Sequence, residues 1–172
     1  MNSKQIYLAP YSNEWPHEFE REKKVLLEAI GEWVEDIQHV GSTAIPGMSA
    51  KPIIDIMIGV RNLNDADEQC VPRIQQLGYE YIQKYEKELP ERRYFQKTSH
   101  GVRTHQIHLV EINSDWWKRH LLFRDYLRSH PQVAQEYEEL KRSLAKIHSD
   151  TNEYAHAKTA FIREIEKKAK NT

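Results

Sequence analysis

The sequence His39-Val40-Gly41-Ser42-Thr43-Ala44-Ile45-Pro46-Gly47, followed by Lys51-Pro52-Ile53-Ile54-Asp55-Ile56, is the stretch that indicates the fold. It predicts a short strand that ends in a Gly-Ser turn and then a second, nearly all-apolar strand that carries Asp55. A strand that is apolar on both faces is normally covered on both sides. Because an unpaired buried carboxylate is costly, we expect Asp55 to be paired, to coordinate a metal ion or to face a cleft.

The turn at Gly41 and Ser42 has the composition of an anion-binding turn. Glycine lets a phosphate approach the backbone closely, and the N–H groups and hydroxyls of such a turn point toward the anion. A plain strand-to-loop connection is the alternative interpretation. The combination with a carboxylate on the next strand favours a functional site.

The hydrophobic pattern outside this stretch predicts a single α+β domain. We expect helices over residues 14–31 and 64–77 and strands over 34–40, 52–60, 79–83, 92–98 and 102–112. Everything after Ser114 is predicted to be helical, over 114–129, 131–148 and 152–169. The prediction is therefore one domain over residues 1–172, with a mixed sheet flanked by helices and a C-terminal helical layer from about residue 114.

Composition excludes several function classes. The chain has 172 residues and a net charge of −1, which argues against general nucleic-acid binding. A single cysteine, Cys70, excludes an intrachain disulfide and every multi-cysteine metal site. The N-terminus has no secretory signal and no apolar run is long enough to span a bilayer. We expect a cytoplasmic protein with no membrane partner, whose oligomeric state stays open.

The two blocks at 39–47 and 51–56 resemble the signature of the GrpB family. Further matches are 92–95, 103–109, 123–128, and Tyr154 with Lys158, so the resemblance covers about residues 11–169. That family is assigned to the DNA-polymerase-beta-like nucleotidyltransferase superfamily, whose members share a Gly-Ser turn and a downstream Asp-x-Asp/Glu pair. Twelve residues lie between Ser42 and Asp55, which fits the superfamily spacing.

The resemblance implies a nucleotidyltransferase-like fold and a function to go with it. It implies binding of a nucleoside triphosphate and transfer of a nucleotidyl group to an unknown small acceptor. Asp55 would hold Mg²⁺ or another divalent metal ion, as carboxylates do in such enzymes. The candidates for binding the phosphates are Gly41, Ser42, Lys51, Arg103 and Lys158.

Two positions depart from the family pattern. Met57 stands where the second carboxylate is expected, and a thioether is a poor ligand for a hard cation. Gln106 stands where the family often has the first histidine of a His-x-His pair. If Asp55 and His108 lie on neighbouring strands, they would suit a transition metal better than Mg²⁺. Asp55 and His108 are accordingly the candidate catalytic and metal-binding residues.

Lys158 is informative without any family, because it falls within the apolar stripe of the last predicted helix. A lysine there either extends to the surface or meets a negatively charged partner, and we expect a polar cleft beside the sheet. Trp116 and Trp117 are expected in the core or an interface, and His120 on the surface.

Two other functions stay open at this point. One is a catalytically silent module that binds a nucleotide or a coenzyme, which Met57 favours; by resemblance, the family is found fused to dephospho-coenzyme A kinase in some bacteria. The other is a metal-dependent phosphoester hydrolase that uses Asp55 and His108.

Overall fold

The structure is a computed structural model that describes residues 6–171. Its centre is a five-stranded mixed sheet in the order β1-β2-β5-β4-β3. The strands are β1 (Val34–Val40), β2 (Ile54–Val60), β3 (Glu80–Tyr81), β4 (Arg92–Ser99) and β5 (Val102–Glu111). Only the β2–β5 pair is parallel, and the other neighbours are antiparallel. The predicted α+β class is confirmed.

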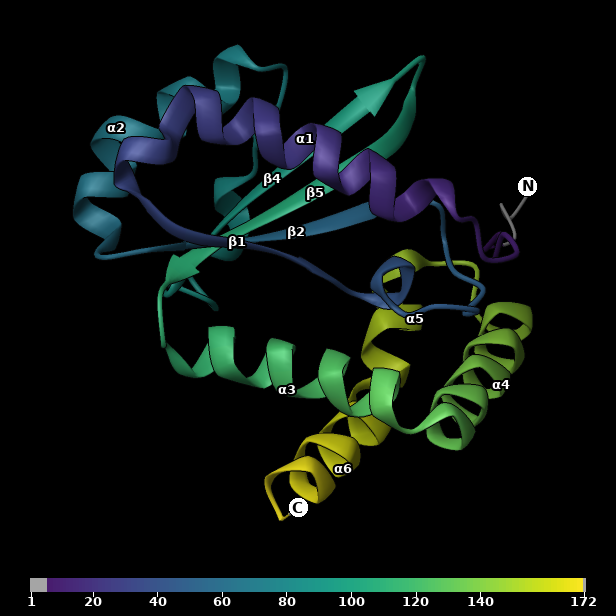
Figure 1. Cartoon of the computed structure of the whole chain (residues 1–172). Helices are drawn as coiled ribbons and strands as arrows, with labels where there is room; N and C mark the ends of the chain where they lie inside the picture. The colour runs from purple at the N-terminus through teal and green to yellow at the C-terminus, as the bar shows by residue number, and fades with distance from the viewer. Residues whose placement is uncertain (1–5, 172) are drawn as a thin grey trace.

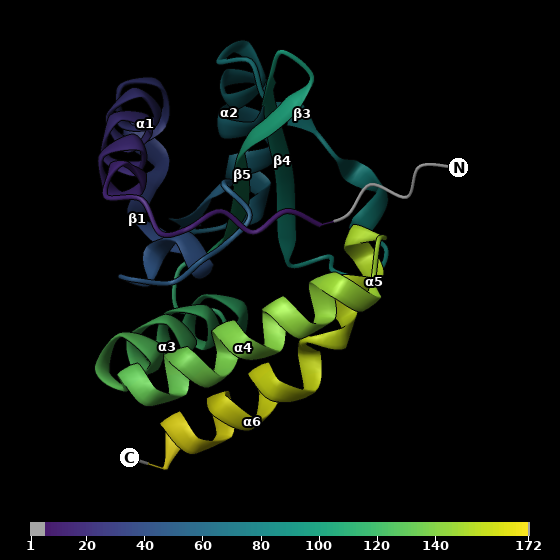
Figure 2. The same cartoon turned by 90° about the vertical axis from the view of Figure 1, so that its right-hand side faces the viewer.

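Helices cover both faces of this sheet (Figures 1 and 2). The helices α1 (Glu14–Ile30) and α2 (Leu63–Gln76) lie on one face. The other side is occupied by α3 (Asp115–Ser129), α4 (Pro131–Ile147), α5 (Thr151–Ala157) and α6 (Thr159–Lys170). These four helices form the predicted C-terminal layer. Within residues 6–171, no helix has the length and apolar character needed to cross a membrane.

Strand β2 shows why the sheet needs both layers. Ile54, Ile56 and Ile58 belong to the large core cluster that also contains residues of α1 and α2. Met57 points to the opposite face, as the two-residue period of a strand requires, and packs with Trp116 and Trp117 of α3. Asp55 lies on the same face as Met57 but nearer the start of the strand, where this face of the sheet borders a cavity.

Two local expectations were wrong. The predicted helix over 152–169 is broken at Lys158, which lies between α5 and α6. The strand expected at 79–83 is reduced to two residues and followed by a 3-10 turn, Gln83–Tyr85. After the Gly-Ser turn the chain forms a three-residue 3-10 turn, Ser42–Ala44. Each break lies beside the cavity, where packing rather than local propensity sets the backbone.

Candidate functional site

A cavity of about 1040 Å³ lies between the sheet and the C-terminal helices. Its walls come from the Gly-Ser turn, the exposed face of β4 and β5, and helices α3 to α6. All seven candidate site residues predicted from the sequence line this cavity: Gly41, Ser42, Lys51, Asp55, Arg103, His108 and Lys158. Segments distant in the sequence therefore converge on one space.

The turn and the carboxylate are in direct contact. Val40 pairs with Asp55 in the β1–β2 ladder, so the residue after Val40 lies beside the carboxylate. Gly41 has φ 76° and ψ −176°, a conformation that essentially only glycine adopts. A Cβ atom at Gly41 would lie 2.5 Å from Asp55 Oδ2. Glycine is needed here both for its backbone angle and for the approach of Asp55.

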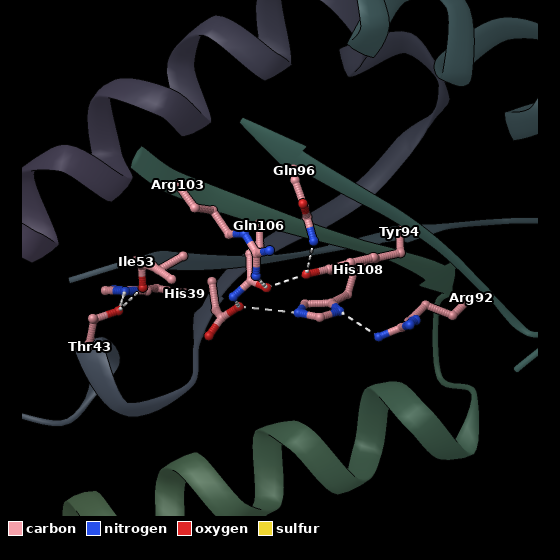
Figure 3. A network of polar contacts seen from close by, with 10 residues as sticks. His39, Thr43, Ile53, Arg92, Tyr94, Gln96, Arg103, Gln106 and His108 are labelled. Atoms are coloured by element: carbon pink, nitrogen blue, oxygen red, sulfur yellow. Dashed lines mark hydrogen bonds and ion pairs between the residues drawn. The ribbon is translucent and has the colours of Figure 1, made fainter. Parts of the chain in front are cut away.

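Asp55 is held by two side chains of β5. Gln106 Nε2 donates to Asp55 Oδ1 at 3.1 Å, and His108 Nε2 lies 3.2 Å from the same oxygen. On the other side of the ring, His108 Nδ1 lies 3.2 Å from an Arg92 guanidinium nitrogen (Figure 3). A guanidinium can only donate, so this network assigns the proton to Nε2 and the acceptor role to Nδ1. Burial lowers the pKa of His108, which agrees with a neutral ring.

The residues around Asp55 do not fit a paired-carboxylate magnesium site. Met57, at the position of the expected second carboxylate, is 0% exposed and packs against Trp116 and Trp117. His108, the other predicted metal ligand, has both ring nitrogens engaged with Asp55 and Arg92. Nowhere in the described residues do three His, Cys, Asp or Glu side chains gather to hold a metal ion. Asp55 itself keeps a side chain that is 25% exposed toward the cavity.

Lysines dominate the opposite wall. Lys158 Nζ lies 4.5 Å from the centre of the Tyr154 ring and Lys51 Nζ lies 5.5 Å from it. A third lysine of the cavity, Lys141 on α4, is 1% exposed and donates to the Ser49 carbonyl at 2.6 Å. The hydroxyl of Tyr154 is buried without a hydrogen-bond partner in the described structure. We call Lys51, Lys141 and Lys158 the lysine cluster.

Burial dominates the electrostatics of the lysine cluster. Burial, followed by repulsion from Lys158, lowers the pKa of Lys51 to about 8 and that of Lys141 to about 7. Burial lowers the pKa of Lys158 to about 8, although Asp55 acts in the opposite direction. Perturbed groups gathered in one cavity are typical of a functional site. Their depressed pKa values indicate that an anion would stabilise the charged forms.

Sequence reasoning missed Lys141, although the signal that revealed Lys158 was present there too. Tyr137, Lys141 and Ala145 are the buried residues of α4 and recur every four positions, so they share one face of the helix. Ser42 lies beside the Tyr137 hydroxyl, which connects the Gly-Ser turn to the same helix face.

Two arginines of α3 fix the backbone around the turn. Arg124 donates to the His39 carbonyl at 3.0 Å and to Gln38 Oε1 at 2.7 Å. Arg128 donates to the Ala44 carbonyl at 3.0 Å. On the inner side, His39 Nε2 lies 2.9 Å from Thr43 Oγ1. These contacts hold the turn from both sides.

His120 corrects one expectation. It was expected on the surface, but its ring stacks on Trp116 with centroids 3.4 Å apart and lines the cavity. Burial lowers the pKa of His120 to about 3, so the ring is neutral. Trp116 and Trp117 are buried, as expected.

Comparison with known proteins gives relatives over nearly the whole chain. The "Glutamate-rich protein GrpB" of Alkalihalophilus pseudofirmus is 40% identical over 169 residues, which cover 96% of each chain. A dephospho-CoA kinase of Mycolicibacterium paratuberculosis is 29% identical, with 95% of this chain matching 46% of that longer protein.

Solved structures support the same relationship. The crystal structure of the conserved protein GrpB from Enterococcus faecalis matches with a TM-score of 0.84 and 35% identity, covering 95% of this chain and 96% of that chain. The Cid1 poly(U) polymerase, in a structure titled with bound MgGTP, matches with a TM-score of 0.54 and 14% identity, covering 80% of this chain and 44% of that chain. At that identity the likeness shows the fold alone, which is nucleotidyltransferase-like. The family model described as GrpB protein matches residues 5–168, and the chain belongs to the GrpB family.

Proposed function

We propose that this protein binds a nucleoside triphosphate in the cavity, with the phosphates between the Gly-Ser turn and the lysine cluster. The observation that carries the proposal is the convergence of Lys51, Lys141 and Lys158 on one buried space with lowered pKa values. A polyphosphate would supply the negative charge that these ammonium groups lack. Charge-assisted hydrogen bonds to phosphate oxygens are among the strongest polar contacts in proteins.

In this proposal each nominated residue has a defined role. The backbone and hydroxyl of the turn at Gly41 and Ser42 contact phosphate oxygens, while Lys51 and Lys158 neutralise them from the facing wall. Arg103, whose guanidinium lies 3.4 Å from Gln106 Oε1, flanks the carboxylate side of the cavity. Asp55, which is hydrogen-bonded to Gln106 and His108, repels the phosphates and so limits how far they extend along the cavity.

The geometry favours binding over two-metal nucleotidyl transfer. Because Met57 stands at the second position, Asp55 has no second carboxylate beside it on β2 to hold a pair of metal ions. The lysine cluster would instead neutralise the phosphate charge that such metal ions neutralise in two-metal enzymes. Two activities beyond binding, nucleotidyl transfer to a small acceptor and hydrolysis of a phosphoester, release different products. Pyrophosphate release would indicate transfer, and orthophosphate release would indicate hydrolysis.

Calorimetric titration of the purified chain with ATP tests the proposal. We expect binding with EDTA present as well as with Mg²⁺, and a loss of affinity of about tenfold, or 1.4 kcal/mol, in Lys158→Gln. Lys146→Gln is the matched control, because Lys146 is an exposed lysine of α4 that does not line the cavity. Absence of ATP binding at millimolar concentration, or equal affinity in both variants, would refute the proposal.

A further inference from the structure

Two adjacent arginines at the start of β4 have opposite environments. Arg93 points away from the cavity and forms a bidentate ion pair with Asp67, at 2.7 and 3.1 Å. Arg92 points into the cavity, as the alternation of a strand requires. The charge of Arg93 is therefore compensated within the protein.

No carboxylate forms an ion pair with Arg92 in the described part of the chain. Its guanidinium lies 4.6 Å from the centre of the Tyr94 ring and 6.0 Å from those of Tyr85 and Trp116. Its one side-chain hydrogen bond joins a terminal nitrogen to His108 Nδ1, and its Nε atom is buried with no hydrogen-bond partner. Glu91 and Asp55 act on it only at longer range.

A half-buried guanidinium in this state is costly without a ligand. Taking a charge out of water is unfavourable unless a partner charge and hydrogen bonds replace the solvent. Aromatic faces offset part of that cost, but they leave the unpaired N–H groups unsatisfied. Arginine is also the side chain whose planar group matches carboxylate and phosphate oxygens two at a time.

Arg92 and the lysine cluster occupy different parts of the same cavity. Lys51 and Lys158 lie against the Tyr154 ring of α5, whereas the rings around Arg92 are those of Tyr85, Tyr94 and Trp116. His108 lies between Arg92 and Asp55 and is hydrogen-bonded to both. Figure 3 shows Arg92 and Arg103 on opposite sides of the His108 ring.

We propose that Arg92, walled by Tyr85, Tyr94 and Trp116, is a second subsite that binds the oxyanion of a second ligand, a carboxylate or a phosphate. This inference rests on the proposed function only for the identity of the first ligand, the nucleoside triphosphate. It gives the second ligand a chemical class: a small acidic molecule whose anionic group lies on Arg92 and whose remainder extends along His108 toward Asp55. The aromatic walls would contact its apolar part.

The test measures anion binding in the presence of saturating ATP. ATP fills the lysine cluster, so inorganic phosphate in one titration and malonate in another report on the second subsite and distinguish its two chemistries. We expect at least one of these anions to bind the unmodified protein, and its affinity to fall about tenfold in Arg92→Gln. The affinity for ATP should change less than threefold in that variant.

Two further variants make the outcome specific. Arg92→Lys keeps the charge but not the planar fork, so we expect an intermediate affinity, and this variant serves if Arg92→Gln melts at a lower temperature. Arg61→Gln removes an exposed arginine that pairs with Glu35 outside the cavity, and should leave anion binding unchanged.

The two proposals fail separately. If ATP does not bind but phosphate or malonate does, and Arg92→Gln weakens it, the nucleotide proposal is wrong and the second subsite stands. If ATP binds and neither small anion does, or if Arg92→Gln binds the anion as well as the unmodified protein, the second subsite is refuted.

Discussion

Substituting Gly41 by alanine should show how tightly the turn and Asp55 are fitted together. The backbone at Gly41, with φ 76° and ψ −176°, costs a non-glycine residue roughly 1–3 kcal/mol. The new Cβ would also lie 2.5 Å from Asp55 Oδ2 and 3.1 Å from Asp55 Cβ. Since real Cβ atoms do not approach so closely, either the carboxylate or the turn must move.

The second part of the cost comes from the hydrogen bonds that hold Asp55. Displacing the carboxylate would lengthen its contacts with Gln106 and His108, now at 3.1 and 3.2 Å. A hydrogen bond to a charged group contributes roughly 1.5–3 kcal/mol. We therefore expect Gly41→Ala to lower the free energy of unfolding by about 2.5–6 kcal/mol, as the sum of the backbone cost and the loss of one such hydrogen bond.

Gly47→Ala is the matched control, and urea denaturation is the assay. Gly47 also has a positive φ, 81°, but no atom lies within 4 Å of its Cβ position. It should lose only the conformational part, so the difference between the two variants isolates the contact with Asp55. A difference below about 0.5 kcal/mol, the usual error of such comparisons, would refute the close fit.

Three further predictions concern the packing of β2 against α3 and the lysine cluster. Gly59→Ala would place a Cβ 2.7 Å from Ile112 Cδ1 and 2.9 Å from the Trp117 ring, and should cost roughly 1–3 kcal/mol by overpacking, measured by urea denaturation. Met57→Asp introduces a second carboxylate at a fully buried position and should destabilise the fold by roughly 3–5 kcal/mol; an equally stable variant with new Mg²⁺-dependent ATP binding would contradict our interpretation of Met57. The free energy of unfolding of the ligand-free protein should rise from pH 7 to about 8.5. In this range Lys141 binds fewer protons in the folded protein, where its pKa is about 7, than in the unfolded chain, where its pKa is the ordinary 10.5. Lys141→Met should reduce this pH dependence in denaturation curves, and an unchanged pH dependence would show that Lys141 is not its source.

The effect of pH on ligand binding has the opposite sign. The ammonium form of the lysine cluster is the one that binds a polyphosphate, so bound ATP would restore the protons that burial removes. Stabilisation by ATP should therefore be greatest near pH 7 and fall as the pH rises through about 8, the pKa of Lys51 and Lys158. Melting temperatures with and without ATP across that range would measure it.

Much of the fold could be predicted from the sequence because its signals are local. The apolar run around Ile54, Ile56 and Ile58 identified a buried strand, and β2 is an inner strand between β1 and β5. The strand predicted over 102–112 carries Gln106 and His108, and both side chains reach Asp55. The break of the last helix at Lys158 was missed, because the residues around it have ordinary helix propensity and only the packing of α5 and α6 decides the break.

The candidate residues from the sequence all line one cavity, but the balance of charge in that cavity was not predicted. A lysine within an apolar stripe led to Lys158, and the same pattern in α4 would have led to Lys141. The contrast between Arg92 and Arg93 could not be read from the sequence, because Asp67, which pairs with Arg93, lies on a different element.

The sequence by itself determined most of the helices and strands and the candidate site residues, since hydrophobic period, glycine and an isolated carboxylate are properties of neighbouring positions. Only the tertiary structure decided which charges are compensated. It buried Met57 beneath Trp116 and Trp117, engaged both nitrogens of His108, and brought three lysines and Arg92 into the same cavity as Asp55. The physical reason is that electrostatic energy and desolvation depend on distances between residues that lie far apart along the chain.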